Sequence, residues 1–159
     1  MNDVVADDEL LYRCVFHGAD RYYYLEESGV RLSSQAFADR GQAPSVDRAK
    51  LCNYDPQWTQ KNPNDAVVSL VAGDIRVIDD IVQKDAKGKE LWTYKIDVCP
   101  RPLADNPAHA QIEPSPAYQN RNTFRKVSEK LARLATERIA EQGWEIEPYE
   151  LRNLSSSDH

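Results

Sequence analysis

Hydrophobic and polar residues alternate along several short stretches of the chain, which is the pattern of β-strands. Residues 10–16 (LLYRCVF) are rich in aromatic and aliphatic residues and predict a first strand. Residues 66–70 (AVVSL) form a short apolar run typical of a buried strand, and residues 75–82 follow with several β-branched residues. These segments are therefore expected in a sheet.

The clearest hairpin lies in the middle of the chain. Residues 85–88 (DAKG) predict a tight turn, and residues 90–98 (ELWTYKIDV) then alternate strictly. One face of this strand carries Trp92, Tyr94, Ile96 and Val98. We expect the hairpin to join the central sheet and to bury Trp92 or Tyr94 against a helix.

One long helix is predicted near the C-terminus. Apolar residues recur every three or four positions within residues 122–142, and Gly143 is a natural stop. The apolar face of this helix consists of Phe124, Val127, Leu131, Leu134, Ala135 and Ile139. Residues 144–149 are expected to add a final strand or to dock back on the sheet.

Shorter elements are expected in the connections. Residues 21–25 (RYYYL) fit either a strand or a short helix. Ser45 or Asp47 is expected to cap a short helix. Five prolines interrupt residues 99–118, so residues 109–112 are the only strand predicted there and the rest is a long loop.

Together these elements predict an α+β fold: a mainly antiparallel sheet, one long C-terminal helix packed on it, and short helices in the connections. A length of 159 residues fits one domain, which we place at residues 10–152. The polar ends, residues 1–9 and 153–159, are expected to be disordered.

The charge of the chain changes the picture of its partners. The formal net charge is -6 and the pI is near 5.1, which makes nucleic acid an unlikely partner, because phosphate binding needs a basic face. Six cationic residues lie within residues 121–138, but Glu129 and Glu137 are interleaved with them, which is typical of a solvated helix face.

The three cysteines, Cys14, Cys52 and Cys99, are far apart and odd in number, so we expect reduced, buried thiols. The acidic N-terminus has no signal-peptide pattern, and no apolar run reaches the roughly 18 residues of a membrane span. The sequence therefore predicts a cytoplasmic protein without a membrane partner.

Motifs for metals and nucleotides are missing from the sequence. The three histidines are scattered, and the carboxylates of Asp79, Asp80 and Asp85 around the hairpin are expected to be solvated. There is no glycine-rich phosphate loop and no GxSxG motif. We expect no metal and no cofactor.

Two polar clusters remain as candidate sites. The first has Arg13 and His17 at the end of the first strand and Ser33, Ser34 and Gln35 in RLSSQAF; the second has Asn106, His109, Gln111 and Glu113 in NPAHAQIE. Their order resembles the arginine, serine and glutamate pattern of ADP-ribosyltransferases. That resemblance implies an enzyme that uses NAD, with Arg13 and Ser33 holding the cofactor and Glu113 acting as the acid. Otherwise Arg13 pairs with a carboxylate, the serines satisfy a turn, and Glu113 is a surface residue.

A second enzymatic hypothesis is metal-independent ribonuclease chemistry. His17 and His109 would act as acid and base, with Arg13 or Arg101 stabilising the phosphorane. The acidic charge counts against this hypothesis.

The segments LYR, SSQAF, PSVDRA and NPAHA are also similar to those of a family of small uncharacterised bacterial proteins. The similarity covers most of residues 10–112. It implies a bacterial or phage origin and a functional role for these polar segments, without naming that role.

The leading hypothesis is a small protein-interaction module with an accessory, immunity or defence role. Tyr22, Tyr23, Tyr24 and Trp58 would anchor the interface, or else fill the core. If residues 108–112 join the same sheet as the first strand, Arg13 or His17 should lie near His109 or Asn106 in one cleft, with Ser33 or Ser34 on its rim. Otherwise Asn106 makes a turn and His109 bonds only to backbone.

Overall fold

The computed structural model describes residues 4–17, 22–26, 29–78 and 81–156. Its central element is a six-stranded antiparallel sheet. The strand order is β5-β1-β4-β8-β7-β6, and β2 and β3 form a separate pair. The strands are β1 Leu10–Val15, β2 Tyr23–Glu26, β3 Gly29–Leu32, β4 Ser45–Arg48, β5 Ala66–Val71, β6 Ile81–Lys84, β7 Glu90–Pro100 and β8 His109–Ser115. The helices are α1 Ala72–Arg76, α2 Arg121–Gln142 and α3 Tyr149–Ser156, with 3-10 turns η1 Ser34–Phe37, η2 Ala49–Cys52 and η3 Pro56–Trp58.

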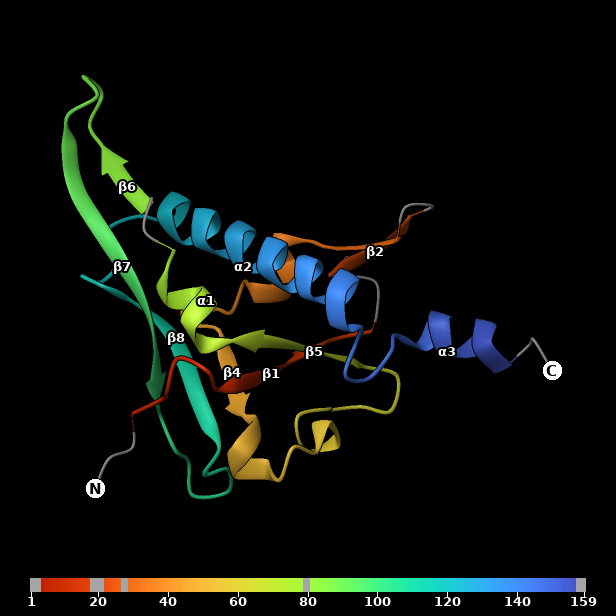
Figure 1. Cartoon of the computed structure of the whole chain (residues 1–159). Helices are drawn as coiled ribbons and strands as arrows, with labels where there is room; N and C mark the ends of the chain where they lie inside the picture. Colours follow the sequence, from red (N-terminus) through yellow and green to blue (C-terminus); the bar gives the residue numbers. More distant parts are fainter. Residues whose placement is uncertain (1–3, 18–21, 27–28, 79–80, 157–159) are drawn as a thin grey trace.

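The predicted α+β architecture is confirmed. The long helix α2 lies along one face of the sheet (Figure 1), and the short helix α1 contacts β5 and β7. Asn120 begins α2 by accepting the Thr123 N–H at 2.9 Å, and Gly143 ends it with a φ of 84°, where glycine avoids a Cβ clash. Val127 and Leu131 are fully buried against the sheet in the main core.

The predicted hairpin β6–β7 is present in the sheet. Tyr94 is fully buried, and its ring contacts Tyr118, whose ring in turn contacts Phe124 of α2. Trp92, the alternative that the alternation allowed, is 41% exposed. The reason is that β7 pairs with β8 only from Lys95 onwards, so Trp92 lies beyond the core.

Two predicted elements are wrong. Residues 45–48 form strand β4 rather than a capped helix, because β1 and β8 flank this segment and pair with it on both sides. Residues 72–76 form α1, although residues 75–82 were expected as strand. Directly after β5 the Gly73 N–H donates to the carbonyl of Asp7, and the Ile75 side chain of α1 is buried in the core. Strand β6 begins only at Ile81; residues 79 and 80 lie outside the described residues.

The proline-rich segment contains more strand than predicted. β7 continues through Pro100, and β8 extends from His109 to Ser115 with Pro114 inside it. β8 pairs with β4 only at residues 109–111, so Pro114 lies beyond that ladder, on a stretch where only β7 is its neighbour. A residue without an N–H is tolerated at such an edge position.

Described residues just outside the predicted domain bounds of 10–152 contact the rest of the protein. Val5 is fully buried, and the carboxylate of Glu9 accepts two hydrogen bonds of 2.9 Å from the buried guanidinium of Arg48. Ile146 makes an isolated bridge to Val67 instead of a final strand, and α3 reaches Ser156. Of residues 21–25, for which the sequence allowed a strand or a short helix, residues 23–25 belong to strand β2, which pairs with β3.

Replacing Leu131 by Asp should lower the free energy of unfolding by several kcal/mol, about 3–5, because the change buries an unpaired carboxylate between α2 and the sheet. Urea denaturation followed by circular dichroism measures it. Arg133→Asp, at an exposed position of the same helix, is the control. Equal stability of the Leu131→Asp protein and wild type would show that this face of α2 is not in the core.

Candidate functional site

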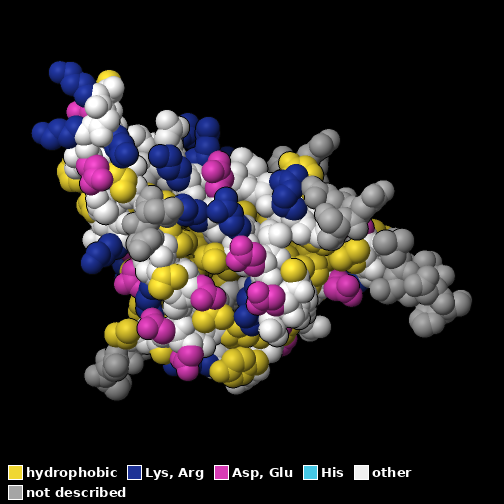
Figure 2. Space-filling view, turned by 45° about the horizontal axis from the view of Figure 1, so that its top comes forward, with side chains coloured by type: hydrophobic (Ala, Val, Ile, Leu, Met, Phe, Trp, Pro, Cys, Tyr) yellow, Lys and Arg dark blue, Asp and Glu magenta, His cyan; other side chains and the backbone are white. Residues whose placement is uncertain are grey.

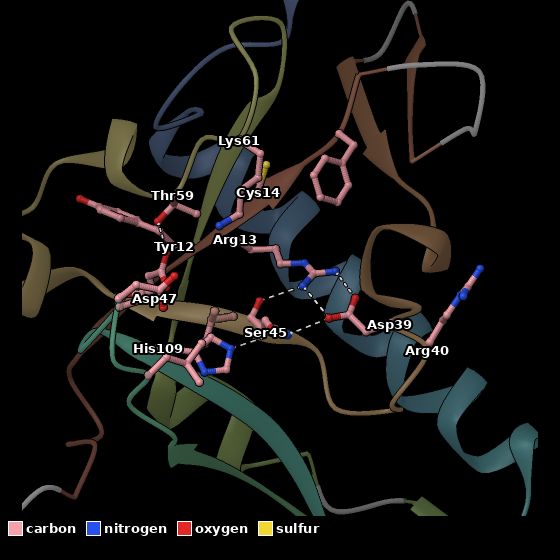
Figure 3. A pocket seen from close by; sticks show the side chains of 15 residues that line it. Tyr12, Arg13, Cys14, Asp39, Arg40, Ser45, Asp47, Thr59, Lys61 and His109 are labelled. Atoms are coloured by element: carbon pink, nitrogen blue, oxygen red, sulfur yellow. Dashed lines mark hydrogen bonds and ion pairs between the residues drawn. The ribbon is translucent and has the colours of Figure 1, made fainter.

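The candidate site is a pocket where β1 and β4 separate. The two strands pair only at Leu11 and Tyr12, and beyond these residues the ladder ends. A pocket of about 480 Å³ opens at this separation (Figure 3). Its lining consists of Tyr12, Arg13, Cys14, Phe16, Asp39, Arg40, Ser45, Val46, Asp47, Thr59, Lys61, Leu103, Asp105, Asn106 and His109.

Arg13 crosses the separation with its guanidinium. Its Nε and Nη2 donate to the carbonyl of Ala36 at 3.0 and 2.7 Å, and its Nη1 donates to the carbonyl of Ser45 at 2.8 Å. The remaining two N–H groups bind both oxygens of Asp39 at 3.1 and 2.6 Å. Since a guanidinium has five N–H donors, all of them are used within the protein.

Asp39 is the counter-charge of Arg13. Burial alone would raise the pKa of this carboxyl, but the hydrogen bonds and charge of Arg13, together with the Ser45 N–H, outweigh burial and lower the pKa below its ordinary value of 3.8. The Phe37 ring covers the guanidinium, with its centroid 5.3 Å from Cζ. The pair therefore stays ionised although Arg13 is buried.

His109 faces Ser45 in the same pocket. Its Nδ1 lies 2.8 Å from the carbonyl of Arg101, which can only accept, so Nδ1 carries the proton. In the neutral ring Nε2 is then an acceptor, and it lies 3.1 Å from Ser45 Oγ. The serine hydroxyl therefore donates to the imidazole, as in a nucleophile paired with a general base.

A buried carboxylate lies beside this pair. Asp47 is opposite Tyr12 in β1 and opposite His109 in β8. Its two oxygens accept hydrogen bonds from the Thr59 hydroxyl at 2.7 Å and from the Asn106 side-chain amide at 2.8 Å. Asp47 of β4 thus joins polar side chains of the two neighbouring loops in one network.

The site has only part of what acyl transfer needs. The N–H of Ser45 donates to Asp39 at 2.9 Å, so it is not available to stabilise an oxyanion. Cys14 also lines the pocket, but burial raises the pKa of its thiol to about 11, which disfavours the reactive thiolate. Within the described ranges, no group of three or more His, Cys, Asp or Glu side chains is placed to hold a metal ion.

Of the residues predicted for the site, the structure brings Arg13, Asn106 and His109 together in this pocket. The condition for that prediction is met, because β8 joins the same sheet as β1 through β4. Ser45 links the two clusters directly: its carbonyl accepts from Arg13 and its hydroxyl bonds His109. Parts of LYR, SSQAF, PSVDRA and NPAHA therefore meet here, since Arg13 also binds Ala36.

The other predicted residues lie apart from the pocket lining. His17 Nδ1 lies 3.2 Å from a carboxylate oxygen of Glu150 in α3, and Ser33 accepts from the Gln35 N–H at the start of η1. Ser34 lines a different pocket. Glu113 forms an exposed ion pair with Arg101 at 2.7 Å. The arginine, serine and glutamate of the transferase pattern are thus not gathered around one cavity.

The four aromatic residues divide between core and surface. Tyr22 and Tyr23 are half-buried and pack against the main core, and the Tyr23 hydroxyl donates to Glu150 at 2.6 Å. Tyr24 lies under the guanidinium of Arg31 at 4.4 Å. Trp58 is 45% exposed, and its indole N–H donates to Asn106 at 3.0 Å.

Ser45, Asp47, Asp39 and Thr59 were not recognised as site residues from the sequence. The one local signal was the alternation in SVDR, which places Ser45 and Asp47 on the same face once the segment is read as a strand.

Comparison with protein-family models, with curated proteins and with solved structures finds no match for this chain. Among the described residues, no helix has the length and apolar character needed to cross a membrane.

Replacing Arg13 by Ala should lower the free energy of unfolding by about 3 kcal/mol, because Asp39 would stay half-buried without its partner and two carbonyls would lose their donors. Chemical denaturation measures the change. Arg40→Ala, an exposed neighbour that lines the same pocket, should stay within about 0.5 kcal/mol of wild type. A marginal effect of Arg13→Ala would contradict a bridging role.

The Asp39 carboxyl also predicts how stability depends on pH. Its pKa is lowered by folding, so its contribution is fully present above the ordinary value of 3.8 and is lost as pH falls through the lower folded value. Thermal melting from neutral pH down to acid should show this loss. Asp39→Asn should be less stable at neutral pH and should lose less on acidification. Parallel curves for the two proteins would refute this assignment.

Proposed function

We propose that this chain is a small protein-interaction module, whose binding surface lies on the loops beside the pocket. The observation that supports the proposal most directly is a set of large apolar side chains exposed on two loops at this end of the sheet. They are Leu51, Tyr54, Trp58 and Leu103, exposed by 43%, 61%, 45% and 51%. Exposed apolar groups around a polar centre are typical of protein interfaces.

The loops that carry these side chains are held in place. Asn53 and Tyr54 both have positive φ, 57° and 56°, which asparagine tolerates but which is strained for a bulky residue such as tyrosine. The Tyr54 N–H donates to the carbonyl of Ala49 at 2.8 Å. This conformation presents the Tyr54 ring to solvent. Strain of this kind is common where a loop has a functional task.

A second contact fixes one loop against the other. The Trp58 indole donates to Asn106, and Asn106 forms a bridge with Leu103 in the connection between β7 and β8. The two loops also lie side by side at the lower end of the molecule (Figure 1). A preformed surface loses little conformational entropy on binding, which favours affinity.

The alternative enzymatic functions receive less support from the geometry. The donors of Arg13 are all bound within the protein, so Arg13 has none left for the phosphates of NAD. His17, the partner of His109 in the ribonuclease hypothesis, is engaged with Glu150.

The three free cysteines fit a reducing compartment. We therefore propose an accessory or immunity role in the cytoplasm.

The proposal is tested with a displayed library of natural protein fragments selected on the wild-type chain. Selected fragments should lose about ten-fold or more in affinity for Leu103→Asp or Tyr54→Asp, because the charge disrupts the apolar contact. The matched control is Val77→Asp, since Val77 is a 72% exposed apolar residue at the end of α1. Fragments that bind all three variants equally would show that the surface is elsewhere.

A further inference from the structure

A second surface lies at the other end of the sheet, on the ribbon formed by β6 and β7. β8 accompanies β7 only from Lys95 to Pro100, so residues 90–94 have β6 as their only neighbour in the sheet. The ribbon therefore projects from the body beside the N-terminal half of α2 (Figure 1).

The ribbon exposes an indole on the side of α2. Trp92 is directly opposite Gln83 in the ladder, so the two side chains share one face. Tyr94, two residues further along β7, is on that face as well and leads into the rings packed on α2. Trp92 is 41% exposed and does not belong to the core clusters of the described residues.

A groove of about 500 Å³ runs between the ribbon and α2. Its lining combines three cations with four amide or hydroxyl side chains and one carboxylate: Lys84, Arg125 and Lys126, then Gln83, Asn120, Asn122 and Thr123, then Glu129. Trp92 is not part of this lining, but its cross-strand partner Gln83 is, so the indole is one side chain away from the groove on the same face of the ribbon.

The charge at this end is opposite to that of the whole chain. Residues 81–95 and 121–130 hold eight Lys and Arg but three Asp and Glu, in a protein with a net charge of -6. One of these acids, Asp85, is used in the ribbon turn, where it accepts the N–H groups of Lys87 and Lys89. Figure 2 shows Lys and Arg side chains gathered over the ribbon and α2, and Asp and Glu more frequent below them.

We propose that this groove binds single-stranded nucleic acid, with the phosphates on the cations and a base stacked on Trp92. A basic groove with an accessible aromatic ring is the usual arrangement for single strands, because each base has a face that can stack. The amides of Asn122 and Gln83 offer donors and acceptors to base edges. A duplex keeps its bases stacked on one another, so it gains only the phosphate contacts.

The nucleic-acid groove is separate from the proposed protein-binding surface. It also revises the expectation, drawn from the net charge, that nucleic acid is an unlikely partner. An average of -6 excludes a mainly basic surface, but not a basic end on an acidic molecule. The phosphate contacts are made by few cations, so the binding should be moderate and sensitive to salt.

The test uses fluorescence anisotropy with labelled oligo(U) and oligo(dT) of roughly 10 nucleotides at low salt. Binding should weaken as salt rises, with a slope of log K against log salt of about -2 for three phosphate contacts. Trp92→Ala should weaken binding by roughly five-fold or more, Trp92→Phe should retain most of it, and Lys126→Glu should weaken it about ten-fold. Melting temperatures of the variants check that they are folded.

The matched control is Arg133→Glu, the same change of charge at an exposed position of α2 outside the groove lining, which should stay within about two-fold of wild type. No binding of either strand at low salt would overturn the proposal. Equal losses for Lys126→Glu and Arg133→Glu with no effect of Trp92→Ala would also overturn it, since that result means diffuse attraction. An unlabelled duplex that competes as well as the single strand would exclude the stacking on Trp92.

Discussion

The guanidinium of Arg13 holds together a sheet that would otherwise separate. β1 pairs with β4 at two residues only. From Arg13 onwards the backbone ladder between the two strands is absent, and five hydrogen bonds of the Arg13 side chain take its place. These bonds fix η1, β4 and Asp39 relative to β1. The cost of burying the charge is offset only because Asp39 is ionised and bidentate.

The two faces of the sheet follow from that arrangement. The face under α2 takes the apolar residues, while the opposite face of β4 and β8 carries Ser45, Asp47 and His109. These side chains line a pocket because the separation of β1 and β4 leaves it open and Arg13 keeps it from closing by further pairing. The pocket therefore depends on the ion pair between buried Arg13 and half-buried Asp39.

The sequence predicts those parts of this fold that local patterns determine. Helix α2 has a 3.6-residue period and the β6–β7 hairpin has a period of two, so both were found. Strand β4 was missed because PSVDRA carries helix-capping residues, and only β1 and β8, distant in sequence, impose the extended form. Arg13 and His109 were found as members of two polar clusters, but the roles of Ser45 and Asp39 arise from contacts across 32 and 26 residues of chain.

The net charge describes neither end of the molecule. The ribbon and the start of α2 concentrate Lys and Arg, whereas the pocket lining is mixed, with Arg13, Arg40 and Lys61 beside Asp39, Asp47 and Asp105. Salt screens the interaction between exposed charges beyond roughly 8–10 Å at moderate ionic strength. A ligand at one end would therefore respond to the charges near it and not to the net charge of the chain. A protein partner at the pocket end and a nucleic acid at the ribbon would thus neither compete nor repel each other.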